Sequence, residues 1–185
     1  MKEDYENVKE LLARTKYDEH LWDVCGDFKM IGFLLGLQAG YTKYSCFLCL
    51  WDSRAATEHY KRIDWPLRTE LEPGKFNVAK QPLVQRDKIL LPPLHIKLGL
   101  IKKFGIFIGP QVKVMLASEE LFTKMNDVEK KAWRAIADVV TGFLGNNKAP
   151  NYKDLVSRMI KAYENMGCRM SLKLHYLHSH LDFFS

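Results

Sequence analysis

The sequence predicts a mixed α+β fold in which helices predominate. Apolar residues recur at helical spacing near both ends of the chain, and residues 20–51 have the order strand, helix, strand. Hydrophobic residues make up 47% and charged residues 27% of the 185 residues, which is typical of a globular chain and excludes a disordered one. No apolar run approaches the roughly 18 residues of a membrane span, so no membrane partner is expected.

The first 60 residues are expected to form helix, strand, helix and strand. Residues 4–16 carry apolar side chains on one helical face, and residues 20–25 alternate as in a short strand. Residues 28–38 are apolar nearly all round, which predicts a buried helix with Asp27 at its N-cap. Residues 44–51 would be the second strand. The strand–helix–strand order predicts that the two strands are parallel, a βαβ unit.

The remaining residues, 61–185, are expected to form a mostly helical region. Five prolines in residues 63–94 predict an ordered but irregular connector. In the last third, Asp127 and Asn151 each precede a segment with one apolar face, Ser171 precedes a segment that holds His175 and His178, and all three are expected to cap a helix.

Cys46 and Cys49 form a C-x-x-C pair, the most specific local motif of the chain. Two thiolates at this spacing can bind one zinc ion because a short turn brings both sulfurs to the metal. The alternatives are a pair of buried cysteines in an apolar strand and a thioredoxin-like redox pair. Since the charged N-terminus does not resemble a secretory signal, metal or redox chemistry is expected rather than a disulfide.

His175, His178 and His180 are three of the six histidines of the chain. Two imidazoles and two thiolates would complete a closed, tetrahedral, structural zinc site. On a continuous helix His175 and His178 share a face, whereas His175 and His180 do so only if the helix ends or bends between them. The alternative is a polar helix face with solvated histidines.

Asp27 follows the first expected strand, where open α/β sheets place functional groups. A carboxylate there could hold a catalytic magnesium or manganese ion, and the alternative is a helix N-cap alone. One carboxylate cannot build a two-metal site, and no clear partner is present in the sequence. The usual nucleotide-binding, serine-hydrolase and zinc-protease motifs are absent.

The formal net charge is +6 and the isoelectric point is near 9.1. A basic chain favours an acidic partner, and nucleic acid is the commonest one. The lysines are spread along the sequence, so charge alone does not decide between DNA contact and an ordinary solvated surface.

Six motifs spread along the chain can be compared with known families. They are Cys25-Gly-Asp27-Phe-Lys29, Leu34-Leu-Gly-Leu-Gln38, Cys46-Phe-Leu-Cys-Leu-Trp-Asp-Ser-Arg54, Asp64-Trp-Pro-Leu-Arg68, Leu91-Pro-Pro-Leu-His-Ile-Lys-Leu-Gly99 and Leu174-His-Tyr-Leu-His-Ser-His-Leu-Asp-Phe-Phe184. Together these motifs resemble a family of transposon-derived proteins of invertebrate genomes. This family is similar to DDE transposases with an RNase H-like core, and its layout resembles that of the Transib transposases and the recombination-activating recombinase of antigen-receptor genes.

The resemblance implies a role for each matched residue. Asp27 matches the second acidic residue of the D-D-E triad, and residues 1–60 would be a partial RNase H-like core with a helical insertion after it. Cys46, Cys49, His175 and His180 match the ligands of a structural zinc ion, with His178 as the alternative histidine.

The departures from the family pattern imply an inactive protein. The first acidic residue and the catalytic glutamate have no match, so we expect a transposase-derived fragment that does not cut or join DNA. Magnesium or manganese would bind only in an intact relative. The expected partners are DNA and either a second copy or an intact transposase, in the nucleus or cytoplasm. The rival hypotheses are a zinc-stabilised protein-interaction module without a nucleic-acid role, and a thiol redox protein that uses Cys46 and Cys49.

Overall fold

The computed structural model describes residues 4–40, 42–91, 93–101, 104, 114–145 and 148–184. The chain forms two compact units. The first unit is Met1–Arg54 with Trp65–Pro92, and the second is Ala55–Asp64 with Pro93–Ser185. Helices provide most of the regular structure, and the sheet of the described residues has two short parallel strands. The predicted α+β, mostly helical class is therefore confirmed, while an RNase H-like origin of residues 1–60 stays a prediction.

Two helices open the first unit. Helix α1, Tyr5–Arg14, begins at Asp4, whose carboxylate accepts the N–H of Asn7 at 3.0 Å. Helix α2, Tyr17–His20, ends at Leu21, which has a left-handed backbone with φ of 49°. The expectation that residues 20–25 form one strand is therefore wrong at its start, because the left-handed turn separates the helix from the strand.

Strand β1, Val24–Cys25, leads into helix α3, Phe28–Leu34. After α3 the chain turns at Gly36, where φ is 68°. A Cβ at this position would lie 2.0 Å from the carbonyl oxygen of Lys80, so only glycine allows this close approach of the two backbones. The N–H of Ala79 donates to the Gly36 carbonyl at 2.7 Å, which attaches the end of α3 to the irregular segment.

The partner of β1 is strand β2, Ile89–Leu90, which pairs with it in parallel and follows the short 3-10 helix η1, Arg86–Lys88. The predicted second strand at residues 44–51 is wrong. This segment bends instead, and its ladder contact is one isolated bridge between Cys49 and Leu67. The parallel connection observed is thus much longer than the βαβ unit expected from the sequence.

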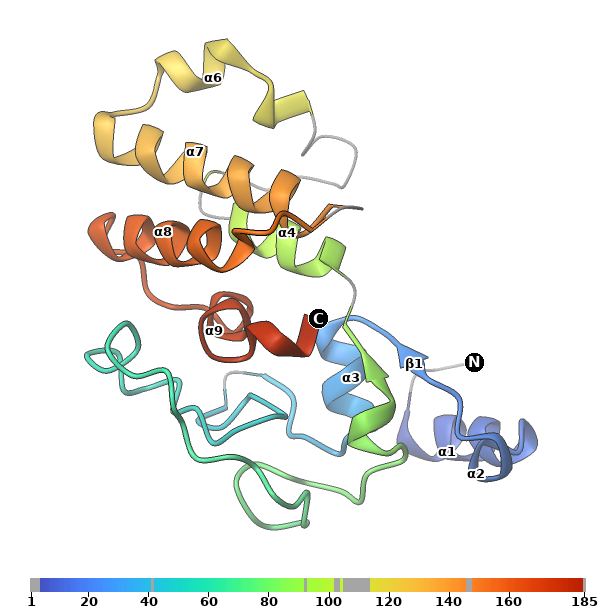
Figure 1. Cartoon of the computed structure of the whole chain (residues 1–185). Helices are drawn as coiled ribbons and strands as arrows, with labels where there is room; N and C mark the ends of the chain where they lie inside the picture. Colours follow the sequence, from blue (N-terminus) through green and yellow to red (C-terminus); the bar gives the residue numbers. More distant parts are fainter. Residues whose placement is uncertain are drawn as a thin grey trace. The chain divides into compact units, whose positions relative to one another are not determined.

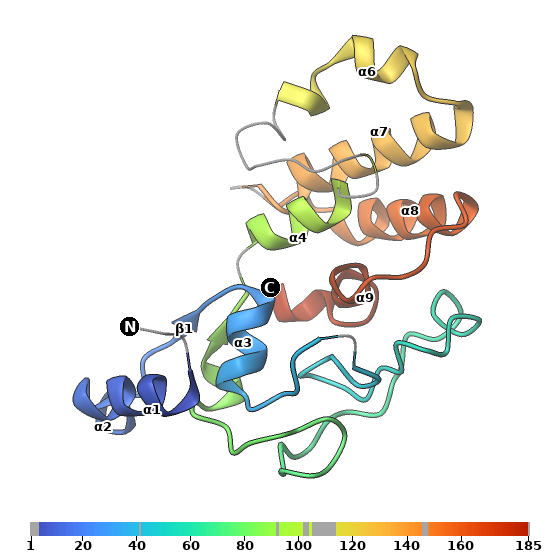
Figure 2. The same ribbon diagram turned by 180° about the vertical axis from the view of Figure 1, so that it is seen from behind.

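The second unit is built from helices. Helices α7 and α8 lie side by side along much of their length (Figure 1), and the view from behind shows the same pair (Figure 2). Helix α4 packs against α9 in this unit. No helix among the described residues has the length and apolar character that a bilayer crossing requires. The elements are α4 (Pro93–Ile101), α6 (Glu119–Thr123), α7 (Asp127–Gly142), α8 (Tyr152–Asn165), α9 (Leu172–Ser179) and the 3-10 helix η3 (Leu181–Phe184).

The observed capping residues of these helices agree in part with those predicted from the sequence. Helix α7 is capped by Asn126, not by Asp127, because Asn126 and Glu129 form a reciprocal capping box. Asp127 then falls in the first turn, where its charge favours the helix N-terminus. Asn151 precedes α8 without a side-chain cap bond. The cap predicted at Ser171 is confirmed, since its hydroxyl accepts a backbone N–H of α9.

Candidate metal centre

The cysteine pair lies on a tight turn of the first unit. Cys46 and Cys49 are both fully buried, and the N–H of Leu48 donates to the Sγ of Cys46 at 3.4 Å. The Sγ of Cys49 accepts a second backbone N–H, from Trp51. In a strand, residues three apart point to opposite faces. The turn therefore permits what the predicted strand would have prevented, namely two sulfurs that face one ion.

The side chain of Arg68 fastens this turn from inside the unit. Arg68 is 2% exposed, and its guanidinium donates to three backbone carbonyls: Cys46 at 3.0 Å, Tyr44 at 3.0 Å and Phe76 at 3.1 Å. Because the planar guanidinium has five fixed donors, one side chain can fasten the segment of Tyr44 and Cys46 to that of Phe76. The sequence gives no local signal for this role, because nothing near Arg68 marks it as buried.

The histidine pair lies at the end of helix α9 in the second unit. His175 is fully buried within the helix, and His180 is the C-cap residue, with φ of −135° and ψ of 40°. The helix ends at Ser179, which meets the condition under which the two histidines were expected to share a site. Their ring centroids are 5.1 Å apart with the ring planes at 89°.

Cys46, Cys49, His175 and His180 together form a group that could hold a metal ion such as zinc. Each residue offers one ligand atom, and these four atoms all lie within 4.8 Å of one another. In a tetrahedral zinc site with bonds of about 2.0–2.3 Å, the ligand atoms are about 3.3–3.8 Å apart. Small side-chain rotations are therefore enough to close this donor set around an ion.

His178, the alternative ligand, is not in this group. It lines a pocket of the second unit with Tyr60, Lys153 and Glu164. Burial, followed by the neighbouring charge of His175, lowers the pKa of His178 and so favours its neutral imidazole. The geometry thus favours His180 over His178 as the second nitrogen ligand.

The surroundings of Cys49 in this turn favour its protonated thiol. The hydrogen bond with Cys46, burial and the charge of Cys46 all raise the pKa of Cys49 well above its usual range. Reactive redox cysteines need the opposite shift, a depressed thiol pKa. A bound metal ion reverses this preference, because a coordinating thiol is deprotonated outright.

Asp27 has a structural role at the start of α3. Its Oδ1 accepts the N–H of Met30 at 2.7 Å, and the side chain is exposed. The predicted N-cap is therefore confirmed. Within the described ranges Asp27 belongs to no group of His, Cys, Asp and Glu that could hold a metal, and its role as a remnant of a catalytic triad stays a prediction.

Comparisons with known proteins match two parts of the chain. Residues 1–84 match a domain of unknown function (DUF8703), and residues 103–145 match another domain of unknown function (DUF8704). No curated protein and no solved structure matches the chain. Cys46 and Cys49 lie within the first matched segment, whereas His175 and His180 lie beyond both. A function for this chain therefore has to be inferred from the chemistry of the four ligand residues.

Proposed function

We propose that the protein binds one structural zinc ion through Cys46, Cys49, His175 and His180. The observation that carries this proposal is the convergence of their four ligand atoms within 4.8 Å. Two sulfur and two nitrogen donors in a tetrahedral arrangement suit zinc better than magnesium, calcium or manganese, which prefer oxygen.

The chemistry of the donor set supports a structural rather than a catalytic ion. Four protein ligands fill the tetrahedral shell of zinc, whereas catalytic zinc keeps one position open for water or substrate. Cys46, Cys49 and His175 are fully buried, which also keeps water away. The ion would fasten the cysteine turn to the end of α9, as the zinc ion does in the layout that the sequence resembles.

We further propose that this zinc-stabilised fold belongs to a transposase-derived protein that contacts nucleic acid without catalysis. The motif resemblance and the net charge of +6 support the nucleic-acid role. Strand transfer requires three carboxylates around divalent ions, and Asp27 is the one residue of this set that the resemblance matches. A zinc-stabilised interaction module without DNA contact is the second candidate.

The zinc content of the purified protein, measured by elemental mass spectrometry, tests the metal site. We expect one zinc per chain, and its loss in Cys46→Ser and in His180→Ala. Cys25→Ser is the matched control, because Cys25 is exposed and lies outside the group, so this variant should retain its zinc. His178→Ala should retain zinc as well, and a loss there would move the second nitrogen ligand to His178.

Folded protein without zinc would overturn the metal site. Circular dichroism of each variant separates loss of a ligand from loss of the fold, because the helices dominate the far-ultraviolet signal.

A further inference from the structure

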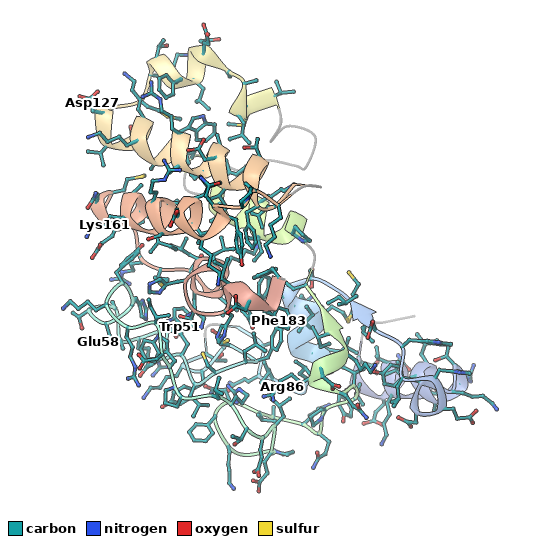
Figure 3. The ribbon with its side chains drawn as sticks, viewed as in Figure 1. Trp51, Glu58, Arg86, Asp127, Lys161 and Phe183 are labelled. Atoms are coloured by element: carbon teal, nitrogen blue, oxygen red, sulfur yellow. The ribbon has the colours of Figure 1, made fainter. Side chains whose placement is uncertain are left out.

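A groove of about 520 Å³ lies between helices α7 and α8 of the second unit. Its polar lining comes from Lys131, Arg134 and Asp138 on α7 and from Arg158, Lys161 and Asn165 on α8. Figure 3 shows Lys161 on α8 near the end of the helix pair at which Asp127 begins α7. The groove lies outside the zinc ligands and has no part in holding the metal.

The charge of this groove is positive and only partly compensated. Within the described part of the chain, Lys131 and Arg158 form no ion pair. Lys161 pairs with Glu164 at 2.7 Å, and Asp138 is the single acidic residue of the lining.

Arg134 is positioned by an aromatic ring beside the groove. Its guanidinium carbon lies 4.7 Å from the ring centroid of Phe122, a cation–π contact that orients the side chain without neutralising it. Three cations are therefore available to a ligand: Lys131, Arg134 and Arg158.

The second unit carries the whole net charge of the protein. It has 16 lysines and arginines against 10 aspartates and glutamates, a formal charge of +6, whereas the first unit has 12 of each. The basic residues are spread along the sequence, yet the acidic residues balance them fully only in the first unit. An acidic partner would therefore be attracted to the second unit.

The other residues that line the groove indicate which kind of acidic partner it can bind. Val128, Ala135 and Ala162 provide short apolar side chains, and no aromatic ring lines the groove. Without an aromatic platform the groove cannot stack unpaired bases. Guanidinium, ammonium and amide donors suit phosphate oxygens, which are the main contacts of proteins with a duplex backbone.

We propose that the α7–α8 groove binds the phosphate backbone of double-stranded nucleic acid. This inference rests on the proposed nucleic-acid role and names the surface that performs it. The contacts are made by Lys131, Arg134 and Arg158, and they do not read base sequence. Binding is therefore tolerant of sequence and sensitive to salt.

The test is fluorescence anisotropy of a short labelled DNA duplex of mixed sequence, titrated with zinc-loaded full-length protein over a series of salt concentrations. The groove variant is Lys131→Gln with Arg158→Gln. The matched control is Lys61→Gln with Arg169→Gln, which removes the same charge from exposed sites of the same unit outside the groove.

Each neutralised phosphate contributes about 0.9 to the slope of log affinity against log salt, so the groove variant should lose about 2 units of slope. Its affinity near 0.1 M salt should fall at least about tenfold. The control should keep most of the native slope and affinity.

Three results would contradict the proposal that the groove binds duplex nucleic acid. They are a groove variant with native slope, a control that loses as much as the groove variant, and polyglutamate that displaces the duplex as effectively as unlabelled DNA does. If the native protein binds the duplex and the groove variant is unchanged, only the groove fails. If the native protein does not bind at low salt, the nucleic-acid role fails with it, while the zinc content remains a separate result.

Discussion

The imidazole rings of His175 and His180 meet edge to face, with centroids 5.1 Å apart, although the two residues are five positions apart in the sequence. On a continuous α-helix, side chains five positions apart diverge by about 140° around the axis. The two rings meet because α9 ends at Ser179 and His180 leaves the helical path. The helix end is thus a requirement of the candidate metal centre, and Ser171 helps to set the other end by capping the helix.

Removal of zinc should destabilise the fold measurably. An ion that binds only the folded state stabilises it by about 2.7 kcal/mol when present at 100 times its dissociation constant. For a chain of this size, that corresponds to a decrease of roughly 5–11 °C in Tm upon chelation. Differential scanning calorimetry with and without a chelator measures the change. Cys46→Ser is the control, because a protein that cannot bind the ion should not respond, and an unchanged native Tm would contradict the metal site.

Zinc affinity should rise with pH. Ordinary thiols keep their protons below about pH 8.5, and the pKa of Cys49 is raised above its usual value, so zinc must displace two protons to bind. Fewer competing protons at higher pH favour the ion, and the apparent affinity should increase about 100-fold per pH unit above the histidine pKa of about 6.5.

The pH at which this rise stops is the sharper test. With ordinary thiols it would level off near pH 8.5, and with a raised Cys49 pKa it should continue beyond that value. Competition titrations against a chelator of known pH dependence measure both features. A pH-independent affinity would exclude thiolate ligation.

Helices were predictable from the sequence because their signals are local. The apolar periodicity of α1, α7 and α8 and the caps at Asp27 and Ser171 each depend on a few neighbouring residues. The sheet was not predictable, because β1 pairs with a two-residue strand that begins at Ile89, far along the chain. Two residues are too few to show any alternation.

The cysteine turn shows how one sequence hypothesis can exclude another. Residues 44–51 are apolar, and an apolar run favours a buried strand. A strand would have placed Cys46 and Cys49 on opposite faces, so it was incompatible with the shared zinc ion predicted from the same residues. The spacing of metal ligands is the stronger signal here, because it specifies the backbone geometry as well as the chemistry.

Replacement of Arg68 should strongly destabilise the protein, although it removes none of the proposed metal ligands. Arg68→Met leaves the carbonyls of Cys46, Tyr44 and Phe76 without the guanidinium donors, and each orphaned buried acceptor costs about 1–3 kcal/mol. We expect a loss of about 3–5 kcal/mol in the free energy of unfolding, measured by urea denaturation. Arg68→Lys should not restore it, because one ammonium cannot match the planar fork.

The matched control for Arg68→Lys is Arg54→Lys, the same substitution at an exposed site. It should change the free energy of unfolding by less than about 0.5 kcal/mol. A near-native Arg68→Met protein would mean that the three carbonyl bonds matter little, and a near-native Arg68→Lys protein would mean that an ammonium can replace the planar fork.

Two substitutions of Asp27 distinguish a structural role of this residue from a metal-binding one. As an N-cap, Asp27 satisfies the N–H of Met30, so Asp27→Ala should destabilise the protein by about 0.5–2 kcal/mol. Asparagine caps a helix about as well as aspartate, so Asp27→Asn should retain nearly all of the stability.

A carboxylate that also held a divalent ion would behave differently, because asparagine removes the charge that attracts the metal. The thermal stability of the native protein and of Asp27→Asn, each measured with and without magnesium, therefore distinguishes the two roles. An equal response of both proteins identifies a cap alone, and a magnesium stabilisation that disappears in Asp27→Asn would show that the carboxylate still binds metal.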